Sequence, residues 1–454
     1  MYRFALEDIK QWYSGHRRKP LVLRGARQVG KSTLVRMAAE SMNLKLIEIN
    51  LERYVYLDEV FKTLDISTII DEIEGIKGSI GERSQALLFL DEIQATPHAI
   101  QALRYFYEDL SDLAVIAAGS LLEFTLANHS FSMPVGRITY YHLGPMSFEE
   151  FLMARDHELF DWYRKTDFTD SFPDSRHNKL LAMQREFLFT GGMPESVLAW
   201  IRTSSPQKVQ DAQRDILNTY TDDFAKYANR ADLARLQKVF RRIPQLAGKK
   251  IKYSHISPED KAAKVKDVID LLSKARICSK VHHSDCSGLP LAAGVNDKVF
   301  KLLFIDVGLM NCLLGLSWID VKNMDERNLI NEGSLAEQFI GQELLYLGGG
   351  KVTPELFYWL REGKGNNAEV DYVISLKGKI LPVEVKSGAS GSMKSLHQFT
   401  LLKNNKRAIR FDLNKPSNQK VQAKTAQKSN IVPVEFDLTS LPLYGVGKLL
   451  NKRI

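Results

Sequence analysis

Residues 20–32 read PLVLRGARQVGKS and decide the fold of the first part of the chain. PLVLRG is an apolar run without alternation, which is typical of a strand buried on both faces of a parallel sheet. KSTLVRMAAESM, residues 31–42, follows with apolar residues at helical spacing. Between them, Gly25 to Ser32 fit the pattern G-x-x-x-x-G-K-[ST], whose place between a strand and a helix is the one that its chemistry needs. The stretch therefore predicts a phosphate-binding loop in an α/β fold.

Each part of this loop has a chemical reason. Glycine lets the backbone wrap closely enough for its N–H groups to point at phosphate oxygens, and the helix N-terminus adds partial positive charge. Lys31 is expected to reach the β- and γ-phosphates of ATP, and Ser32 to ligate Mg²⁺. The residues predicted to bind ATP are Gly25, Ala26, Arg27, Gln28, Val29, Gly30, Lys31, Ser32 and Thr33.

A second strand supplies carboxylates to the same site. Residues 86–92 read ALLFLDE, an apolar strand that ends in Asp91 and Glu92. Because the carboxyl ends of parallel strands meet at one edge of a sheet, both acids should lie beside the phosphate loop. Asp91 is then expected to hold Mg²⁺ through its water shell, and Glu92 to polarise the attacking water. Alternatively, the two acids only begin the next helix, where negative charge is favourable.

Two further residues are candidates for contact with the reacting phosphate. Ser120 ends the next apolar run, residues 113–120, where its hydroxyl could touch the γ-phosphate or the water. Arg137 is a candidate to stabilise the charge of the transition state, in the same chain or from a neighbouring subunit. A surface arginine near the sheet edge explains Arg137 equally well.

The pattern of apolar residues divides the chain into four predicted parts. Strand-like runs alternate with helices over 1–146, which indicates an α/β P-loop ATPase core with a parallel sheet. Helical spacing dominates 147–229, predicted as a helical extension of that core. Helices followed by a small ribbon over 230–325 suggest a winged-helix-like module. The pattern changes again over 326–454, which is predicted as a C-terminal α/β domain.

Composition excludes several classes of protein. With 454 residues, 44% of them hydrophobic, and 62 Lys and Arg against 54 Asp and Glu, the chain is too apolar and too balanced in charge to be disordered. Three cysteines exclude a disulfide scaffold and point to a reducing compartment. Without a long apolar run or a signal peptide at the start, we expect a cytoplasmic protein with no membrane partner. The net charge of +8 permits an anionic partner such as nucleic acid.

Several stretches together resemble a known family. GARQVGKST, LLFLDEIQ, VIAAGS, LGPMSFEEF and FTGGMPE are similar to the AAA-type ATPases of bacteria and archaea related to the archaeal ATPase group. Residues 214–223, 289–316 and 335–345 resemble the conserved C-terminal domain of unknown function that is usually fused to these ATPases. The resemblance implies ATP binding by the residues named above. The C-terminal end of the family is also similar to the PD-(D/E)xK nuclease fold, which is restriction-endonuclease-like.

Residues 368–388, AEVDYVISLKGKILPVEVKSG, are predicted to form a β-hairpin with a two-residue turn at Lys377 and Gly378. In that register Asp371 faces Glu384. The apolar residues then share the opposite face, namely Val370, Tyr372, Ile374, Leu376, Leu381, Val383 and Val385. Directly opposed acids destabilise a sheet, and a shared divalent cation such as Mg²⁺ or Mn²⁺ would explain the pair.

The same residues match the nuclease pattern that the resemblance implies. Asp371 and Glu384 take the place of the metal-binding acids, and Lys386 that of the catalytic lysine. Glu337, on the preceding predicted helix, takes the place of the supporting acid. The alternative is an ordinary solvated sheet face whose charges are balanced by a Glu369–Lys386 pair.

Basic residues gather in two stretches that could bind nucleic acid. Residues 401–428 hold eight Lys and Arg against one acid and are predicted as an exposed loop, which could track a phosphate backbone or be only solvated. The winged-helix candidate carries Arg241, Arg242, Lys249, Lys250 and Lys252.

The sequence leaves two candidate functions for the protein: a Mg·ATP cycle that controls a nuclease-like domain acting on DNA or RNA, or an ATP-dependent switch or scaffold that binds a protein partner and cleaves nothing. The oligomeric state stays open.

Overall fold

The computed structural model describes residues 1–119, 134, 136–168, 171–225, 230–323, 332–362, 367–388, 392–427 and 430–450. These residues divide into two compact units. The first unit comprises residues 1–146, 274–276 and 348–353, and the second comprises residues 147–273, 277–347 and 354–454. Each unit is built around its own sheet, so we describe them one at a time.

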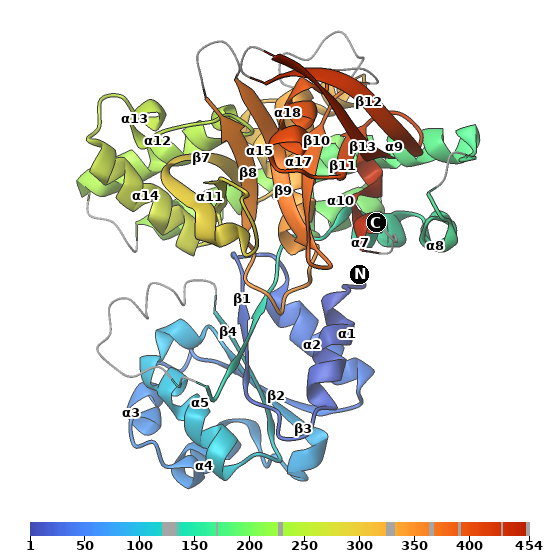
Figure 1. Ribbon diagram of the computed structural model, residues 1–454. Coiled ribbons are helices and arrows are strands. Elements are labelled where there is room, and N and C mark those ends of the chain that lie inside the picture. The colour runs from blue at the N-terminus through green and yellow to red at the C-terminus, as the bar shows by residue number, and fades with distance from the viewer. Residues whose placement is uncertain are drawn as a thin grey trace. The chain divides into compact units, whose positions relative to one another are not determined.

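The first unit is a parallel sheet with helices on both sides (Figure 1). Its strand order is β2-β3-β4-β1-β5, and every neighbouring pair is parallel. The strands are β1 (Leu21–Arg24), β2 (Lys45–Asn50), β3 (Ala86–Asp91), β4 (Ala114–Gly119) and β5 (Thr139–His142). The helices are α1 (Ala5–Tyr13), α2 (Lys31–Ser41), α3 (Leu57–Phe61), α4 (Ile66–Lys77) and α5 (Pro97–Asp109). The predicted α/β fold with a parallel sheet is confirmed here.

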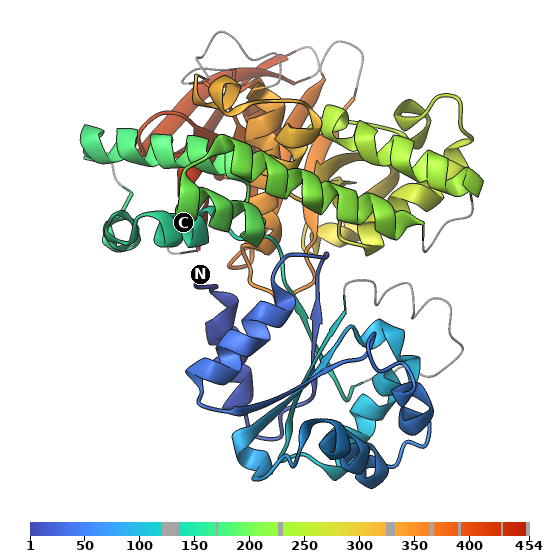
Figure 2. The same cartoon turned by 180° about the vertical axis from the view of Figure 1, so that it is seen from behind.

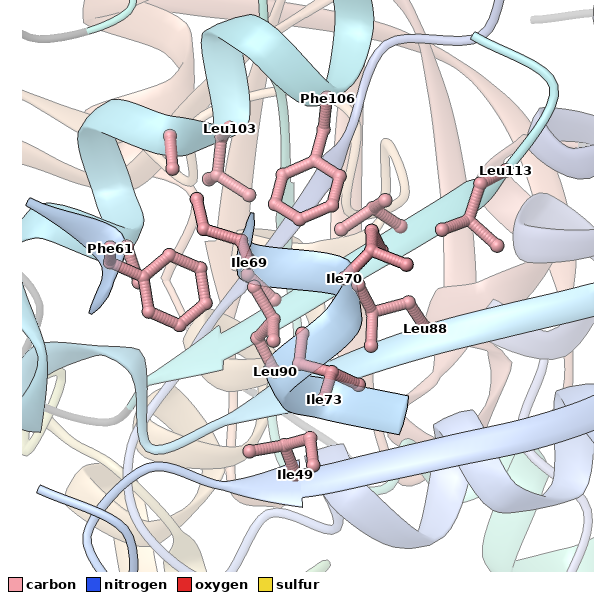
Figure 3. Packing of buried hydrophobic residues seen from close by; sticks show 14 of the residues in the cluster. Ile49, Phe61, Ile69, Ile70, Ile73, Leu88, Leu90, Leu103, Phe106 and Leu113 are labelled. Atoms are coloured by element: carbon pink, nitrogen blue, oxygen red, sulfur yellow. The ribbon is translucent and has the colours of Figure 1, made fainter. Parts of the chain in front are cut away.

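Apolar side chains on one face of this sheet pack against α3, α4 and α5. Figure 3 shows Ile69 of α4 and Phe106 of α5 in the same cluster as Leu88 and Leu90 of β3. Each of these side chains is almost completely buried, which stabilises the unit by about 1.5–3 kcal/mol per side chain. Leu87 of β3 is equally buried but points to the other face, because successive strand residues alternate. Strands β3 and β4 are buried along their whole length because both faces of the sheet are covered there.

Two short segments from later in the sequence complete the first unit. The backbone N–H of His142, at the end of β5, donates a hydrogen bond to the carbonyl of Gly350 at 2.7 Å. A Cβ atom on Gly350 would lie 2.4 Å from the ring of Tyr141, so only glycine lets the segment approach this strand so closely. Lys351 forms an ion pair with Asp8 of α1 at 3.0 Å. The edge strand of the sheet is thus covered by residues that follow it by about two hundred positions.

The second unit contains an eight-stranded mixed sheet of order β12-β13-β11-β10-β9-β8-β6-β7. Its strands are β6 (Cys278–Ser284), β7 (Val295–Phe304), β8 (Leu356–Arg361), β9 (Ala368–Leu376), β10 (Lys379–Val385), β11 (Arg407–Asp412), β12 (Ser417–Gln427) and β13 (Asn430–Pro442). The antiparallel ribbon of β6 and β7 joins the rest through parallel pairing of β6 with β8. The ribbon that suggested a winged helix is therefore part of a larger sheet, and the winged-helix assignment and the four domain boundaries stay predictions.

Helices cover both faces of this second sheet. Figure 2 shows long helices of the central region lying across one face. The helices are α7 (Phe148–Arg155), α8 (His157–Lys165), α9 (Asp174–Thr190), α10 (Pro194–Thr203), α11 (Pro206–Phe224), α12 (Arg230–Leu246), α13 (Tyr253–Ile256), α14 (Ala262–Lys274), α15 (Val307–Leu313), α16 (Trp318–Lys322), α17 (Glu332–Tyr346) and α18 (Lys394–Leu402). Within the described ranges, no helix has the length and apolar character needed to cross a membrane.

The stretch 401–428 is not the exposed loop that its polar composition predicts. It contains the end of α18 and the strands β11 and β12. Strand β12 pairs with β13 over its whole length, and its Val421 and Ala423 pack against the cluster that includes Leu396 of α18. The prediction was wrong because small apolar residues alternate between the lysines, and that period of two is sufficient for an edge strand with one buried face.

Candidate functional site

The predicted phosphate loop joins β1 to α2 in a conformation that needs glycine. Gly30 has φ 92° and Gln28 has φ 63°, both in the left-handed region. A Cβ atom on Gly25 would lie 2.2 Å from the carbonyl oxygen of Leu143. The close approach at Gly25 and the turn at Gly30 therefore explain the two glycines of the motif.

The side chain of Lys31 lies against the backbone of the loop. Its Nζ donates hydrogen bonds to the carbonyl oxygens of Gly25 at 3.0 Å and Ala26 at 2.7 Å. Burial lowers the pKa of Lys31 to about 8, although the negative charges of Glu92 and Asp91 oppose this shift. A buried ammonium that is held by carbonyl dipoles is well placed to meet an anionic phosphate group.

Asp91 and Ser32 meet beside the loop. The Ser32 hydroxyl, at the start of α2, donates to Asp91 Oδ2 at 2.8 Å. Asp91 is the last residue of β3, and burial raises the pKa of its carboxyl group even though the Ser32 hydrogen bond lowers it. The structure thus brings together the two residues that the sequence predicts for Mg²⁺.

Glu92 follows Asp91 with an unusual backbone. Its φ of 52° and ψ of 47° are left-handed, which costs a non-glycine residue about 1 kcal/mol. Its Oε2 accepts a hydrogen bond from the Gln94 side chain at 2.5 Å. Although a short 3₁₀ segment begins here, the Glu92 side chain makes no capping hydrogen bond, so helix initiation does not account for this residue. Strain of this kind is typical of functional positions.

The C-terminal hairpin has the predicted turn and register. Lys377 and Gly378 have φ values of 50° and 74°, as a two-residue type I′ turn requires. Strands β9 and β10 pair from Leu376 with Lys379 up to Tyr372 with Val383. The prediction of this hairpin is confirmed over these pairs, which end one position before Asp371 and Glu384.

The predicted alternation fails at one point, because β9 carries a bulge. Its register against β8 shifts between Phe357 and Trp359, where β9 has one more residue than its partner strand. Val370 and Val373 consequently lie in the same apolar cluster, whereas the Tyr372 hydroxyl donates to the Glu337 carbonyl at 2.8 Å. The prediction that Val370 and Tyr372 share a face was wrong, since an extra residue reverses the alternation.

A buried lysine lies among the acids of this hairpin. Lys301 of β7 is only 1% exposed, and its Nζ lies 2.6 Å from Glu369 Oε1, 3.1 Å from Glu337 Oε2 and 3.5 Å from Asp371 Oδ1. Asp371 also accepts a hydrogen bond from the Val385 N–H at 2.8 Å. The predicted Glu369–Lys386 pair is not formed in this arrangement, because Lys301 takes Glu369 instead.

Glu384 and Lys386 form the other half of this cluster. Lys386 Nζ donates to Glu384 Oε1 at 2.5 Å, while Glu384 Oε2 is buried and accepts no hydrogen bond from any described residue. Burial, and secondarily the charge of Asp371, raises the pKa of both Glu337 and Glu384 well above its ordinary value. We call Glu337, Glu369, Asp371, Glu384, Lys301 and Lys386 the carboxylate cluster.

The carboxylate cluster contains one feature that would favour a bound metal ion and one that opposes it. The unpartnered Glu384 oxygen would suit one. Against this, the buried Lys301 ammonium already occupies the space between three of the acids. Across the part of the chain that the structure describes, no three His, Cys, Asp or Glu side chains are grouped so that they could hold a metal. The predicted second Mg²⁺ or Mn²⁺ site therefore does not fit these residues as they lie.

Comparison with known families agrees with the geometry of the phosphate loop. Residues 17–152 match the family model of an AAA domain. This range contains the loop, Lys31, Asp91 and Glu92. The N-terminal region is therefore similar to an AAA-type P-loop ATPase domain, and we call the first unit the ATPase domain. The regions after this ATPase domain match two families described only as domains of unknown function, DUF8612 over residues 182–320 and DUF4143 over residues 332–436.

Solved structures with some similarity to the chain include a Walker-type ATPase and a protein solved in complex with DNA. A Walker-type ATPase of Pyrococcus abyssi is 14% identical, with 68% of this chain and 94% of that chain covered and a TM-score of 0.43. The ORC1 protein of Aeropyrum pernix, solved in complex with DNA, is 12% identical, with 69% of this chain and 93% of that chain covered and a TM-score of 0.31. No curated protein matches the chain.

Arg3 is a residue of the ATPase domain that sequence reasoning missed. The side chain is buried, and it donates to the Val29 carbonyl of the phosphate loop at 2.8 Å and to the Gly144 carbonyl at 2.9 Å. It lies before α1, far in sequence from the motif. No local pattern marks it, because an arginine near the start of a chain is ordinarily solvated.

The two remaining candidates of the ATPase domain have different outcomes. Ser120 lies outside the described residues. The Arg137 side chain is 42% exposed and its Nε donates to Glu108 Oε1 at 2.7 Å, a residue at the end of α5. The structure therefore does not bring Arg137 together with Lys31, Asp91 or Glu92 through any described contact.

Several basic residues of the second unit are paired with acids. Arg410 Nε lies 2.9 Å from Asp412, Lys415 lies 2.5 Å from Asp174, and Lys420 lies 2.5 Å from Glu435. Lys250 likewise forms an ion pair with Glu362. Each pairing reduces the positive charge that the local sequence offers to a phosphate backbone.

Proposed function

We propose that this protein hydrolyses ATP with Mg²⁺ at the phosphate loop and that the cycle switches the state of its C-terminal region. The observation that carries the ATPase proposal is the 2.8 Å hydrogen bond between Ser32 and Asp91, beside the Lys31 ammonium. A serine hydroxyl and a carboxylate are oxygen ligands of the kind that Mg²⁺ accepts alongside waters and phosphate oxygens, so these residues fit the ion.

Each residue of the site has a distinct proposed role. The backbone N–H groups of residues 25–33 and the Lys31 ammonium bind and orient the phosphates. Ser32 and Asp91 hold Mg²⁺, which when bound neutralises charge on the β- and γ-phosphates. Glu92 orients the attacking water and accepts its proton.

A single substitution tests this assignment. Glu92→Gln keeps the shape of the side chain and should leave ATP affinity within about twofold, while hydrolysis falls by about 10²–10³ because the proton acceptor is lost. Glu59→Gln, on the exposed surface of α3, is the matched control and should hydrolyse ATP normally. Wild-type turnover by the Glu92→Gln variant would remove Glu92 from the mechanism.

Arg137 is retained as a proposed stabiliser of the transition state. If it acts, in its own chain or in a neighbouring subunit, Arg137→Ala should lower kcat by about 10³. An unchanged kcat would mean that Arg137 only forms the surface ion pair with Glu108.

Two roles are candidates for the C-terminal region. The first is metal-dependent cleavage of DNA or RNA, as in the PD-(D/E)xK fold, supported by the hydrogen bond from the Val385 N–H to Asp371, next to Glu384, and by the Glu384–Lys386 contact. The second is a switch or scaffold that binds a protein partner without cleavage. The buried position of Lys301 among Glu337, Glu369 and Asp371 favours this second role, which we adopt.

Incubation of the protein with Mg²⁺ or Mn²⁺ and varied DNA and RNA distinguishes the two roles. The switch role predicts no cleavage by wild type. Cleavage that is lost in Lys386→Ala would establish the nuclease role instead. If nucleic acid is bound without cleavage, the logarithm of affinity should fall with the logarithm of salt concentration by about 0.9 per phosphate contacted, which a protein partner would not produce.

A further inference from the structure

The ammonium group of Lys301 lies where three acidic side chains converge. Glu337 comes from α17, whereas Glu369 and Asp371 come from β9, and Lys301 itself lies on β7. Its Nζ is within 3.5 Å of all three carboxylates, and the residue is 1% exposed. A charge is almost never buried to this degree unless opposite charges surround it.

The backbone fixes this convergence in place. The bulge in β9 brings Asp371 and Tyr372 out of simple alternation, and the Tyr372 hydroxyl then ties β9 to α17 through the Glu337 carbonyl. Gly341 of α17 contributes to the same fit, because a Cβ atom there would lie 2.5 Å from the Tyr372 hydroxyl. The absence of a side chain at Gly341 thus lets α17 pack closely against the sheet, so Lys301 meets Glu337 in a tightly packed region.

Every carboxylate of the cluster has at least one partner, and Glu384 Oε2 is the one buried oxygen of the cluster without a partner among the described residues. Lys301 contacts Glu337, Glu369 and Asp371, the Val385 N–H donates to Asp371, and Lys386 donates to Glu384. A divalent cation placed between Asp371 and Glu384 would meet the repulsion of a buried ammonium that already contacts Asp371. The unpartnered Glu384 oxygen offers a single ligand, whereas Mg²⁺ requires near-octahedral oxygen coordination.

We propose that Lys301 takes the place of a divalent metal ion in the carboxylate cluster, so that the second unit holds a permanent internal cation and no metal centre. The cluster is then an ion-pair core that locks α17 and β7 to the hairpin of β9 and β10. This inference concerns only the second unit and is independent of ATP hydrolysis, so its failure and the failure of the ATPase assignment are distinguishable.

Binding of Mn²⁺ tests the proposal without any assay of activity. All proteins carry Asp91→Asn, which removes the carboxylate expected to hold a metal in the ATPase domain. Bound Mn²⁺ is counted from the loss of the free-ion signal in electron paramagnetic resonance, without nucleotide and at millimolar Mn²⁺. The protein with native Lys301 should bind none at the cluster. One bound equivalent that disappears on adding Glu384→Gln would overturn the proposal.

A variant without the Lys301 ammonium tests whether the acids of the cluster bind a metal ion in its place. Lys301→Met frees the carboxylates of Glu337, Glu369 and Asp371, so one Mn²⁺ should bind. Without Mn²⁺ the unfolding temperature of this variant should be lower than that of the protein with native Lys301, and it should rise when Mn²⁺ is added. Lys301→Arg keeps the charge and should bind no Mn²⁺. If Lys301→Met does not fold, the pair Lys301→Met with Glu369→Gln keeps the net charge of the cluster and still leaves Glu337, Asp371 and Glu384 for the metal. Absence of Mn²⁺ binding by the folded Lys301→Met variant, or by this pair where it is needed, would also overturn the proposal.

Discussion

The backbone N–H of Gly192 donates a hydrogen bond of 2.6 Å to the Oδ2 atom of Asp306, 114 residues further along the chain. Asp306 is completely buried, and its other oxygen accepts from the Leu309 N–H at the start of α15. Burial raises the pKa of Asp306 to about 6 although backbone N–H groups surround it. The Asp306 side chain therefore joins the backbone of FTGGMPE, residues 189–195, to the backbone at the start of α15.

Substitution at this junction should be costly. A Cβ atom on Gly191, whose φ is 69°, would lie 2.0 Å from Asp306 Oδ1. Gly191→Ala should therefore lower the free energy of unfolding by about 2–4 kcal/mol, from overpacking together with a left-handed backbone. Denaturant titration measures the change. Gly315→Ala is the matched control, because Gly315 has a φ of 76° but an empty surrounding space, and it should cost only about 1 kcal/mol. Equal losses in the two variants would show that Asp306 does not restrict position 191.

Removal of Arg3 should affect ATP binding more than the chemical step. The Arg3 guanidinium holds the Val29 carbonyl within the phosphate loop, so Arg3→Ala should loosen the loop and raise KM for ATP about tenfold, with a smaller change in kcat. Arg3→Lys should recover part of the loss. Arg36→Ala removes an exposed arginine of α2 and should leave KM unchanged. A fall in kcat alone, with KM constant, would contradict a role in positioning the loop.

Stability of the first unit should decrease in mild acid because of His142. Burial, and then the charges of Arg276 and Arg24, lower the pKa of His142 from 6.5 to about 4. The unfolded chain therefore binds more protons than the folded protein between these values, so the free energy of unfolding falls as pH drops from 6.5 towards 4, by up to about 3 kcal/mol.

The comparison variant for this pH effect is His142→Asn. It should be less stable than wild type at neutral pH, yet its stability should depend less steeply on pH over the same interval. Thermal unfolding monitored from pH 7 to pH 4 gives both curves. Substitution of the exposed His16 in the same unit should leave the wild-type slope intact. If His142→Asn keeps the full wild-type slope, another group is responsible.

Features that depend on neighbouring residues were predictable. The phosphate loop, the helix that follows it and the hairpin at Lys377 and Gly378 are all specified within about ten positions of sequence, where turn residues and periodicity act directly. The proximity of Asp91 to Ser32 followed from a general rule about the carboxyl ends of parallel strands. Their role in holding Mg²⁺ stays a prediction.

Features that depend on distant partners were missed. The bulge at Asp371 and Tyr372 has no glycine to mark it, and it results from packing between β8, β9 and α17. Strand β12 resembles a loop in composition and becomes a strand through its pairing with β13. Arg3 has the sequence context of a surface residue, although its hydrogen bonds bury it.

The amino-acid sequence by itself determined the phosphate loop, the strand that carries Asp91 and Glu92, and the hairpin that carries Asp371 and Glu384. Only the tertiary structure decided that Lys301, 70 positions before Asp371, lies among those acids. The reason is physical: backbone conformation responds to residues a few positions away, whereas the partner of a buried charge is whichever opposite charge the packed chain brings within about 4 Å.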